Sequence, residues 1–347
     1  MTPLPFPVQP MLAKAVTAVP APDSVPGGLV YEPKWDGFRA VVRIEDGACE
    51  IGSRGSKPLT RYFPELVEAL LQNLPERCVL DGEIVVRRGE PGAERLDWDA
   101  LSQRIHPAES RIRALAGQTP ASFIAFDLLA LDEHDLLGLP FAQRREALEG
   151  IGVGFDAPVH LSQVTDDVEL ARRWLVEFEG AGLDGVMAKP LTAVYEPGKR
   201  RMLKVKHHRS ADTVVLGYRV HRSGEGVGSL LLGLYDDAGQ LRNVGGISAF
   251  SDARRRELVE ELEVDVLRDD DGEVVHGETE RNRFAKDVSY VGLRPRRVVE
   301  VRYDQMEGDR FRHTVQFERW RPDREASSCT FDQLDLPAAY DLSEVLR

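Results

Sequence analysis

The spacing of hydrophobic positions predicts strands that alternate with helices over residues 29–206. Short runs rich in β-branched and aromatic residues predict strands at 40–44, 78–80, 83–86 and 123–129. Helical periodicity, with Pro64 in the first turn of the first segment, predicts helices at 64–71, 141–148 and 166–179. The pattern indicates an α+β domain built on antiparallel strands, without a βαβ repeat or a glycine-rich phosphate loop.

The pattern changes after Asp212. Short strands are predicted at 213–218, 229–235, 297–303 and 312–317, with a single helix at 252–262. This arrangement fits a small β-barrel such as the OB-fold, a common platform for nucleic acids. We therefore predict a first domain over residues 1–211 and an OB-fold domain over 212–347. Asp212 is either a hinge residue at the junction or a linker aspartate.

Length and composition fit two globular domains, because 347 residues exceed one ordinary core. Hydrophobic residues make up 42% of the chain, but no apolar run is long enough to predict a membrane span. The proline-rich start, residues 1–10, does not resemble a secretory signal. Cys49, Cys78 and Cys329 lack metal-site spacing, so we expect reduced thiols in a cytoplasmic protein.

The net charge of −13 does not by itself exclude nucleic-acid binding, because binding follows the local charge. Lysines and arginines gather at 199–222 and 294–297, whereas acidic residues gather at 260–280. This separation predicts one basic face and one acidic face. A mixed, solvated surface is the alternative, and the acidic segment suggests no function beyond a solvated loop.

Two short runs carry the candidate chemistry. Residues 32–39 (EPKWDGFR) place Lys34 in an apolar turn flanked by acids, and residues 203–206 (LKVK) put two lysines on one face of a strand. This combination suggests an amine that attacks a nucleotide phosphate, which requires desolvation or nearby cations to lower the lysine pKa. The alternatives are a snorkelling lysine and a solvated strand face.

These two runs belong to a series of short motifs along the chain. They are Lys34-x-Asp36-Gly37-x-Arg39, Ser53-Arg54-Gly55, Asp81-Gly82-Glu83, Phe126-Asp127, Asp184-Gly185-Val186, Lys204-Val205-Lys206 and Arg321-Pro322-Asp323-Arg324. From Pro10 to Arg324 the chain resembles the covalent nucleotidyltransferases: ATP-dependent DNA ligases, RNA ligases and capping enzymes. It is most similar to the compact bacterial ligase C subgroup, which implies an adenylation domain and an OB domain without an added N-terminal DNA-binding domain.

The resemblance implies a role for each motif. Lys34 would form a lysyl-AMP bond with ATP and release pyrophosphate. Other positions would bind the nucleotide: Glu32 at the adenine amino group, Phe126 on the adenine ring, Arg39 and Arg54 at phosphate or ribose oxygens, Glu83 at the ribose, Lys204 and Lys206 at the triphosphate, and Arg321 and Asp323 at the pyrophosphate.

The resemblance also implies a metal ion, Mg²⁺ or Mn²⁺ in its place, held by Glu83 and Asp184. Asp184 departs from the glutamate that the family usually has, and its side chain is one methylene shorter. Several positions have plainer interpretations: Glu32 as an exposed acid, Arg54 as a surface arginine, Asp81 as a turn residue, Phe126 as core, and Lys189 as a strand-end charge.

We therefore predict an ATP-dependent DNA ligase that seals 5′-phosphate/3′-hydroxyl nicks through lysyl-AMP and a DNA-adenylate. The predicted partner is nicked duplex DNA, with a repair polymerase or primase as a candidate protein partner and no membrane. The resemblance implies DNA repair, through base excision or end joining, by a monomer in the cytoplasm at the nucleoid. The alternatives are an RNA ligase, a capping-type nucleotidyltransferase, and a non-catalytic OB-type nucleic-acid clamp.

Overall fold

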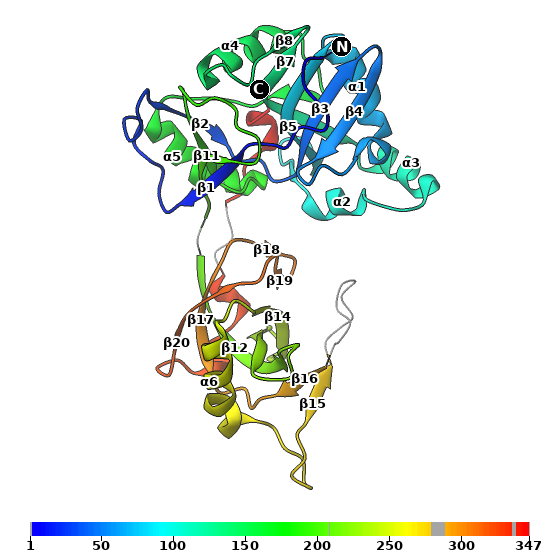
Figure 1. Cartoon of the computed structure of the whole chain (residues 1–347). Coiled ribbons are helices and arrows are strands. Elements are labelled where there is room, and N and C mark those ends of the chain that lie inside the picture. The colour runs from blue at the N-terminus through cyan, green and yellow to red at the C-terminus, as the bar shows by residue number, and fades with distance from the viewer. Residues whose placement is uncertain (1, 208, 279–288, 335–337, 347) are drawn as a thin grey trace. The chain divides into compact units, whose positions relative to one another are not determined.

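The chain forms two units, each with its own hydrophobic core (Figure 1). The computed structural model describes residues 2–207, 209–278, 289–334 and 338–346. Unit 1 contains residues 1–206 and 337–347, and unit 2 contains residues 207–336. Within the described residues, no helix is long and apolar enough to cross a membrane.

Unit 1 contains a small sheet of four strands. Their order is β1 (Leu12–Val16), β11 (Arg200–Val205), β10 (Val186–Pro190) and β2 (Leu29–Pro33). The strands β1 and β11 are parallel, and the other two pairs are antiparallel. The register aligns Ala15, Lys204, Met187 and Glu32 in one row across the sheet. Residues that lie far apart in the sequence of unit 1 are therefore neighbours on one face of this sheet.

The second sheet of unit 1 is larger. Its main order is β4 (Ala48–Ser53), β3 (Phe38–Glu45), β5 (Cys78–Arg88), β7 (Ala121–Leu131) and β8 (His134–Asp135), with β6 (Arg95–Leu96) beside β5 and β9 (Val159–Leu161) beside β7. The strands β7 and β9 are parallel and are joined through the helix α4 (Phe141–Gly152), in contrast to the expected antiparallel pattern.

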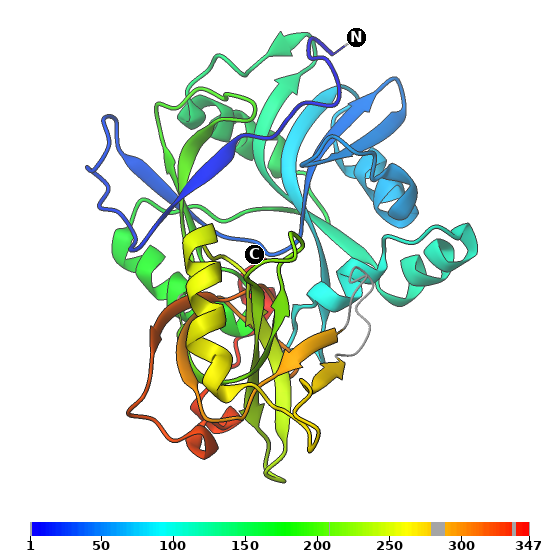
Figure 2. The same cartoon turned by 60° about the horizontal axis from the view of Figure 1, so that its bottom comes forward.

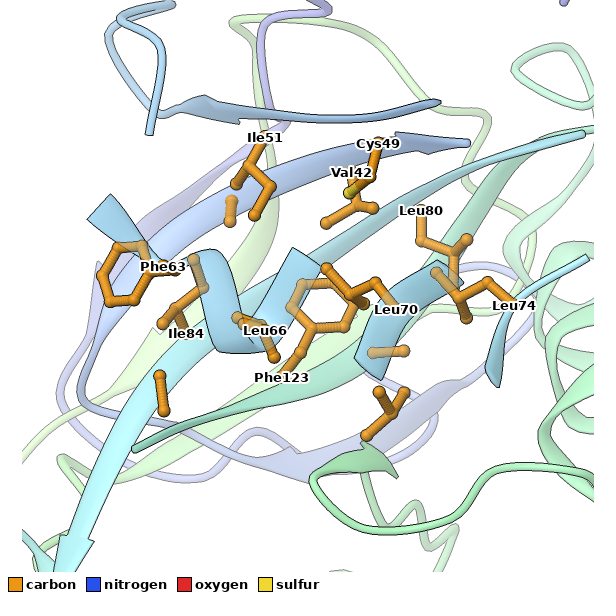
Figure 3. Close-up of a cluster of buried hydrophobic side chains, with 14 of the residues drawn as sticks. Val42, Cys49, Ile51, Phe63, Leu66, Leu70, Leu74, Leu80, Ile84 and Phe123 are labelled. Carbon is orange, nitrogen blue, oxygen red and sulfur yellow. The ribbon is translucent and has the colours of Figure 1, made fainter. Parts of the chain in front are cut away.

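One face of the large sheet packs on helices. The helix α1 (Pro64–Asn73) lies across β3, β4 and β5 and buries Leu66 and Leu70 (Figures 1 and 3). These side chains contact Val42, Leu80 and Phe123, which come from three neighbouring strands and point to the same face of the sheet (Figure 3). The remaining helices of unit 1 are α2 (Trp98–Gln103), α3 (Glu109–Gln118), α5 (Val168–Glu177) and the 3₁₀ turns Thr60–Tyr62, Phe178–Ala181 and Leu342–Glu344.

The other face of the large sheet packs against the small sheet. Val41, Val79 and Leu129 of the large sheet share a buried cluster with Met202 and Tyr195, and partly buried Met187 packs on it. Because side chains alternate, Arg39 and Glu83 point to the same side as Val41 and Val79. Polar side chains of the two sheets therefore face each other next to an apolar core.

Unit 2 is a β-barrel in which one long strand pairs with three others. The strand β12 (Arg209–Val220) pairs with β13 (Val227–Tyr235), β16 (Ser289–Gly292) and β17 (Val298–Tyr303). The strand β13 continues to β14 (Leu241–Ile247), and β17 continues to β20 (Gln316–Trp320). The amide of Val315, next to β20, donates to the carbonyl of Gly246 in β14 and links the two ends of this strand order.

The order β14–β13–β12–β17–β20 is that of the partly open Greek-key barrel of an OB-fold, as the sequence predicts. The helix α6 (Asp252–Leu262), yellow in Figure 2, follows β14 and packs on the barrel. The remaining elements are β15 (His276–Glu278), β18 (Met306–Glu307), β19 (Arg310–Phe311) and the 3₁₀ turns Glu263–Asp265, Ala326–Ser328 and Phe331–Gln333. Residues 279 and 280 of the acidic segment lie outside the described residues.

Two predicted strand positions are wrong. The strand predicted at 312–317 lies at 316–320, because residues 310–311 pair in a hairpin with 306–307 and Val315 crosses to β14. The separate strands predicted at 78–80 and 83–86 are one continuous strand, β5, so Asp81 and Gly82 are not a turn. Position 82 has room only for glycine, because a Cβ there would clash with Phe123, whose Cζ would lie 2.3 Å away.

The predicted boundaries of 1–211 and 212–347 assign residues 207–211 and 337–347 to other parts than the two units described above. Asp212 lies inside β12, which begins at Arg209, so it is not a linker residue. The segment 338–346 packs on unit 1, where Leu342 and Val345 are fully buried. The amide of Leu342 donates to the carbonyl of Glu94, and the ring of Tyr340 lies 5.2 Å from that of Phe178.

The close approach of segment 338–346 to Gly180 gives a testable prediction. A Cβ at position 180 would lie 1.9 Å from the carbonyl oxygen of Ala338 and 2.7 Å from the amide of Tyr340. We expect Gly180→Ala to displace the segment, so that the amide of Leu342 exchanges hydrogen faster and chymotrypsin cleaves the segment sooner, after Tyr340. Gly117→Ala, in α3 with open space around it, is the matched control and should stabilise by up to about 1 kcal/mol. If the amide of Leu342 exchanged at an unchanged rate in Gly180→Ala, that result would contradict the packing of segment 338–346 against Gly180.

Candidate active site

Lys34 is held at the end of β2 by a reciprocal backbone pairing. Its amide donates to the carbonyl of Gly185 at 2.9 Å, and its carbonyl accepts from the amide of Asp184 at 2.9 Å. Gly185 has φ +129°, and an added Cβ would lie 2.0 Å from the carbonyl oxygen of Val205. Only glycine fits this position. Two turns 150 residues apart in the sequence thus fix each other.

The side chain of Lys34 ends beside two other charges. Its Nζ donates to Oδ2 of Asp184 at 2.5 Å, and Nζ of Lys206 lies 3.0 Å from the same oxygen. Burial would raise the pKa of Asp184, but the two ammonium groups outweigh it and hold that pKa below its usual range. Asp184 is therefore a carboxylate at neutral pH that orients the amine of Lys34.

Lys204 lies next to this group on the small sheet. Its row neighbours are Met187 and, beyond it, Glu32. Burial, together with the charges of Lys34 and Lys206, lowers the pKa of Lys204. The sequence prediction that the lysine pair belongs with Lys34 agrees with this geometry, which puts three ammonium groups around one carboxylate.

Arg39 and Glu83 face the cavity from the large sheet, where they are direct partners in the β3–β5 register. Arg39 is fixed by a two-pronged bond to the buried carboxylate of Asp81, with Nε–Oδ1 and Nη2–Oδ2 both at 2.5 Å. The hydroxyl of Tyr195 also donates to Asp81, at 2.6 Å. Asp81, which the sequence suggested as a turn residue, is a buried anchor for Arg39.

Burial raises the pKa of Glu83 to about 7, with Asp36 and Asp81 adding to the rise and Arg39 and Lys34 opposing it.

The turn that carries Lys34 passes directly over the strand β5. An added Cβ at Gly37 would lie only 2.1 Å from the carbonyl oxygen of Ile84 in that strand. The glycine of the KxDG motif is thus required by a close backbone approach.

Glu32 and Lys189 form a buried ion pair at 2.8 Å. Lys189 also donates to the carbonyl of Phe126, and its Nζ lies 4.7 Å from the centre of that ring. Lys189 is therefore not a strand-end charge. Oε1 of Glu32 is buried and accepts no hydrogen bond from any residue that the structure describes, and Nη1 of Arg145 lies 3.8 Å from it.

One cavity of unit 1 collects most of the predicted nucleotide-binding residues. It is lined by Glu32, Lys34, Arg39, Arg54, Glu83, Phe126 and Lys204 from that prediction, and in addition by Met11, Met187, Lys189, Arg200 and Met202. Lys206 and Asp184 adjoin it through Lys34. Arg321 and Asp323 lie in unit 2, where Nη2 of Arg321 is 2.9 Å from Oδ2 of Asp323.

Sequence reasoning missed Lys189, Arg200 and the methionines. Strand alternation was the available signal, because Met187 and Lys189 lie two residues apart in β10, as do Met202 and Lys204 in β11. In each strand a methionine shares its face with a lysine that lines the cavity. This combination offers an apolar surface for a base and cations for phosphates.

The carboxylates could hold a metal ion only together with phosphate oxygens. Within the described part of the chain, no group of three or more His, Cys, Asp or Glu side chains is placed to bind a metal. Glu83 and Asp184 both interact electrostatically with Lys34. Because Mg²⁺ is commonly bound by one or two carboxylates plus substrate phosphates, this donor set fits it.

Comparison with known families supports the motif assignment. Residues 10–206 match the model of the ATP dependent DNA ligase domain, and residues 223–324 match the ATP dependent DNA ligase C terminal region. The two matches together include every site residue discussed above.

Curated relatives match almost end to end. The chain is 54% identical to DNA ligase C of Mycobacterium tuberculosis, over 98% of this chain and 97% of the relative. It is 55% identical to DNA ligase C1 of Mycolicibacterium smegmatis, over the same shares. A solved structure from an analysis of Lig E DNA ligases aligns with TM-score 0.56 at 18% identity, over 90% of this chain and 99% of that one, which supports the two-domain fold. The chain therefore belongs to the ATP-dependent DNA ligase family and is an enzyme of the ligase C type.

Proposed function

We propose that this ATP-dependent DNA ligase uses Lys34 as its nucleophile and stores AMP on it before sealing a nick. The observation that carries the proposal is the position of Lys34 Nζ, oriented by Asp184 at the edge of a cavity with Lys204, Arg39 and Glu83. Preformed ion pairs fix Lys34 and Arg39 before the nucleotide arrives, which is the arrangement that stabilises developing charge.

In the first step the unprotonated amine of Lys34 attacks the α-phosphorus of ATP. A phosphorus–nitrogen bond forms, the bond to the β-phosphate oxygen breaks, and pyrophosphate leaves. Lys204 and Lys206 neutralise the phosphate oxygens, and Arg39 holds a phosphate or ribose oxygen. Phe126 stacks on the adenine, Glu32 accepts from its amino group, and Arg54 contacts phosphate.

Glu83 and Asp184 would hold Mg²⁺, or Mn²⁺, against the phosphates. A bound divalent ion there would neutralise charge on the triphosphate. The carboxylate of Glu83 is also the candidate ligand for the ribose hydroxyls, and Arg321 and Asp323 of unit 2 are the candidate ligands for the pyrophosphate.

In the later steps AMP passes from Lys34 to the 5′-phosphate of nicked duplex DNA. The 3′-hydroxyl then attacks that phosphate, a phosphodiester bond forms, and AMP leaves. We expect DNA binding to weaken steeply with salt, because phosphate contacts release counterions. We place the enzyme in DNA repair at the nucleoid in the cytoplasm, as a monomer, with a repair polymerase or primase as a candidate partner.

Labelling the protein tests the nucleophile. With Mg²⁺ and α-labelled ATP, we expect a covalent label that maps to Lys34 and is absent in Lys34→Arg, because a guanidinium is a poor nucleophile. Lys14→Arg, at an exposed lysine of the small sheet, is the matched control and should label normally.

Parallel reactions with labelled GTP and with ribose-ended nicks separate the alternatives. A label from GTP would instead favour a capping-type enzyme, and sealing only of ribose-ended strands would favour an RNA ligase. If the unadenylated protein, verified by intact mass, takes no label from either nucleotide, the non-catalytic clamp replaces the proposal.

The raised pKa of Glu83 predicts how adenylation depends on pH. The carboxylate is lost as the pH falls through about 7, so kcat/KM for adduct formation should fall more steeply with decreasing pH below that point than above it. Glu83→Gln should lower the rate and remove this steeper decline. Asp323→Asn is the comparison, because the pKa of Asp323 is lowered to about 2 by its bond to Arg321 and its own titration lies far away. A decline that persists unchanged in Glu83→Gln would contradict the assignment.

A further inference from the structure

The carboxylate of Asp212 in unit 2 collects two arginines of the Arg321-Pro322-Asp323-Arg324 motif. Nη1 of Arg321 donates to Oδ1 and to Oδ2 of Asp212, both at 3.0 Å. Nε of Arg324 lies 3.4 Å from Oδ2. The side chain of Asp212 is 11% exposed, so these contacts are partly shielded from water.

The backbone of Asp212 is fixed as tightly as its side chain. Its amide donates to Oε1 of Gln333 at 2.8 Å, and its carbonyl accepts from Nε2 of Gln333 at 3.0 Å. Nε2 of Gln333 also donates to the carbonyl of Thr330, at 2.8 Å. In the sheet, Asp212 is the direct partner of Glu300 on β17. A residue held on both sides of its strand in this way is a rigid support and not a hinge.

The guanidinium of Arg321 therefore has two different edges. Asp212 holds one edge from the strand, and Asp323 occupies the other through Nε and Nη2. The side chain of Asp323 is 63% exposed, in contrast to that of Asp212. The bond to Asp212 fixes the direction of the planar group, whereas the edge at Asp323 is open to solvent and to exchange of partner.

We propose that Asp212, braced by Gln333, is the positioning residue that orients Arg321 and Arg324 for the adenylation step. The inference rests on the proposed function, in which Arg321 meets the pyrophosphate of ATP. A planar donor acts on a phosphate only in the correct orientation, and misplacement by about 1 Å can cost about 100-fold in rate. Asp212 would not touch the nucleotide and would act through the two arginines.

The test separates adenylation from sealing. In Asp212→Asn the shape is kept and the charge is lost, so we expect kcat for adduct formation with ATP to fall about 10- to 100-fold. Sealing of a nick that already carries AMP on its 5′-phosphate needs no pyrophosphate ligand and should stay within about twofold of the unmodified enzyme. Retained sealing also shows that unit 2 is folded.

Three further variants complete the design. Gln333→Met removes both bonds to the backbone of Asp212 but keeps every charge, and should slow adduct formation in the same direction by a smaller factor. Arg321→Ala should show the same split between the two reactions as Asp212→Asn. Asp236→Asn, at a carboxylate of unit 2 that is bonded to Arg242 at 2.7 Å, is the control and should leave both reactions unchanged.

The outcomes distinguish this inference from the proposed function. If the unmodified enzyme takes no label, the proposed function fails. If it does, and either Arg321→Ala or Asp212→Asn forms the adduct at the unmodified rate, the positioning role is overturned. Equal loss of adenylation and sealing in both Asp212→Asn and Gln333→Met would also overturn it, because that result assigns these residues to the stability of the barrel.

Discussion

The reciprocal backbone pairing of Lys34 with Asp184 and Gly185 is the constraint on which the site depends. It joins the end of β2 to the turn before β10, so the ammonium and its carboxylate partner are placed by main-chain bonds before any side-chain rotamer is chosen. The glycine at 185 follows from this pairing, since the backbone passes within contact distance of Val205. Lys204 then lies on β11, the neighbour of β10, and Lys206 follows directly after the end of that strand. Both lysines lie near Lys34, since Lys206 shares Asp184 with it and the charges of Lys34 and Lys206 lower the pKa of Lys204.

The charges around the cavity are stabilised in pairs. Arg39 has Asp81, Glu32 has Lys189, and Lys34 shares Asp184 with Lys206. Removing one partner from such a pair leaves an uncompensated buried charge, which typically costs about 3–5 kcal/mol. These pairs are thus weak evidence for stability and good evidence for orientation, since each fixes the direction of a group that would meet the nucleotide. Glu83 differs, because burial dominates its environment and its pKa lies close to neutrality.

The sequence was sufficient for the fold class and for the order of motifs, because both depend on local patterns: strand runs, turn glycines and short spacings. It was insufficient where partners come from distant strands. Asp81 looked like a turn residue beside Gly82, yet the register of β3 with β5 and the hydroxyl of Tyr195 make it a buried anchor. Lys189 looked peripheral for the same reason, since its partner Glu32 lies on another strand. The return of segment 338–346 to unit 1 left no signal in periodicity, because the segment has only the short 3₁₀ turn Leu342–Glu344 and its buried residues pack against distant parts of unit 1.

Each unit orients by itself the basic group that we propose for the chemistry. In unit 1 the amine is oriented by a carboxylate on a neighbouring turn, and in unit 2 Arg321 is oriented by a carboxylate on a neighbouring strand. In both places the carboxylate is the more buried partner and is itself fixed through its backbone, by Lys34 in one unit and by Gln333 in the other. A reaction that needs a nucleotide in one step and a DNA end in the next requires groups that hold their orientation while their substrates change. Orientation that is built into each unit meets this requirement, since the groups of one unit do not depend on the other for their direction.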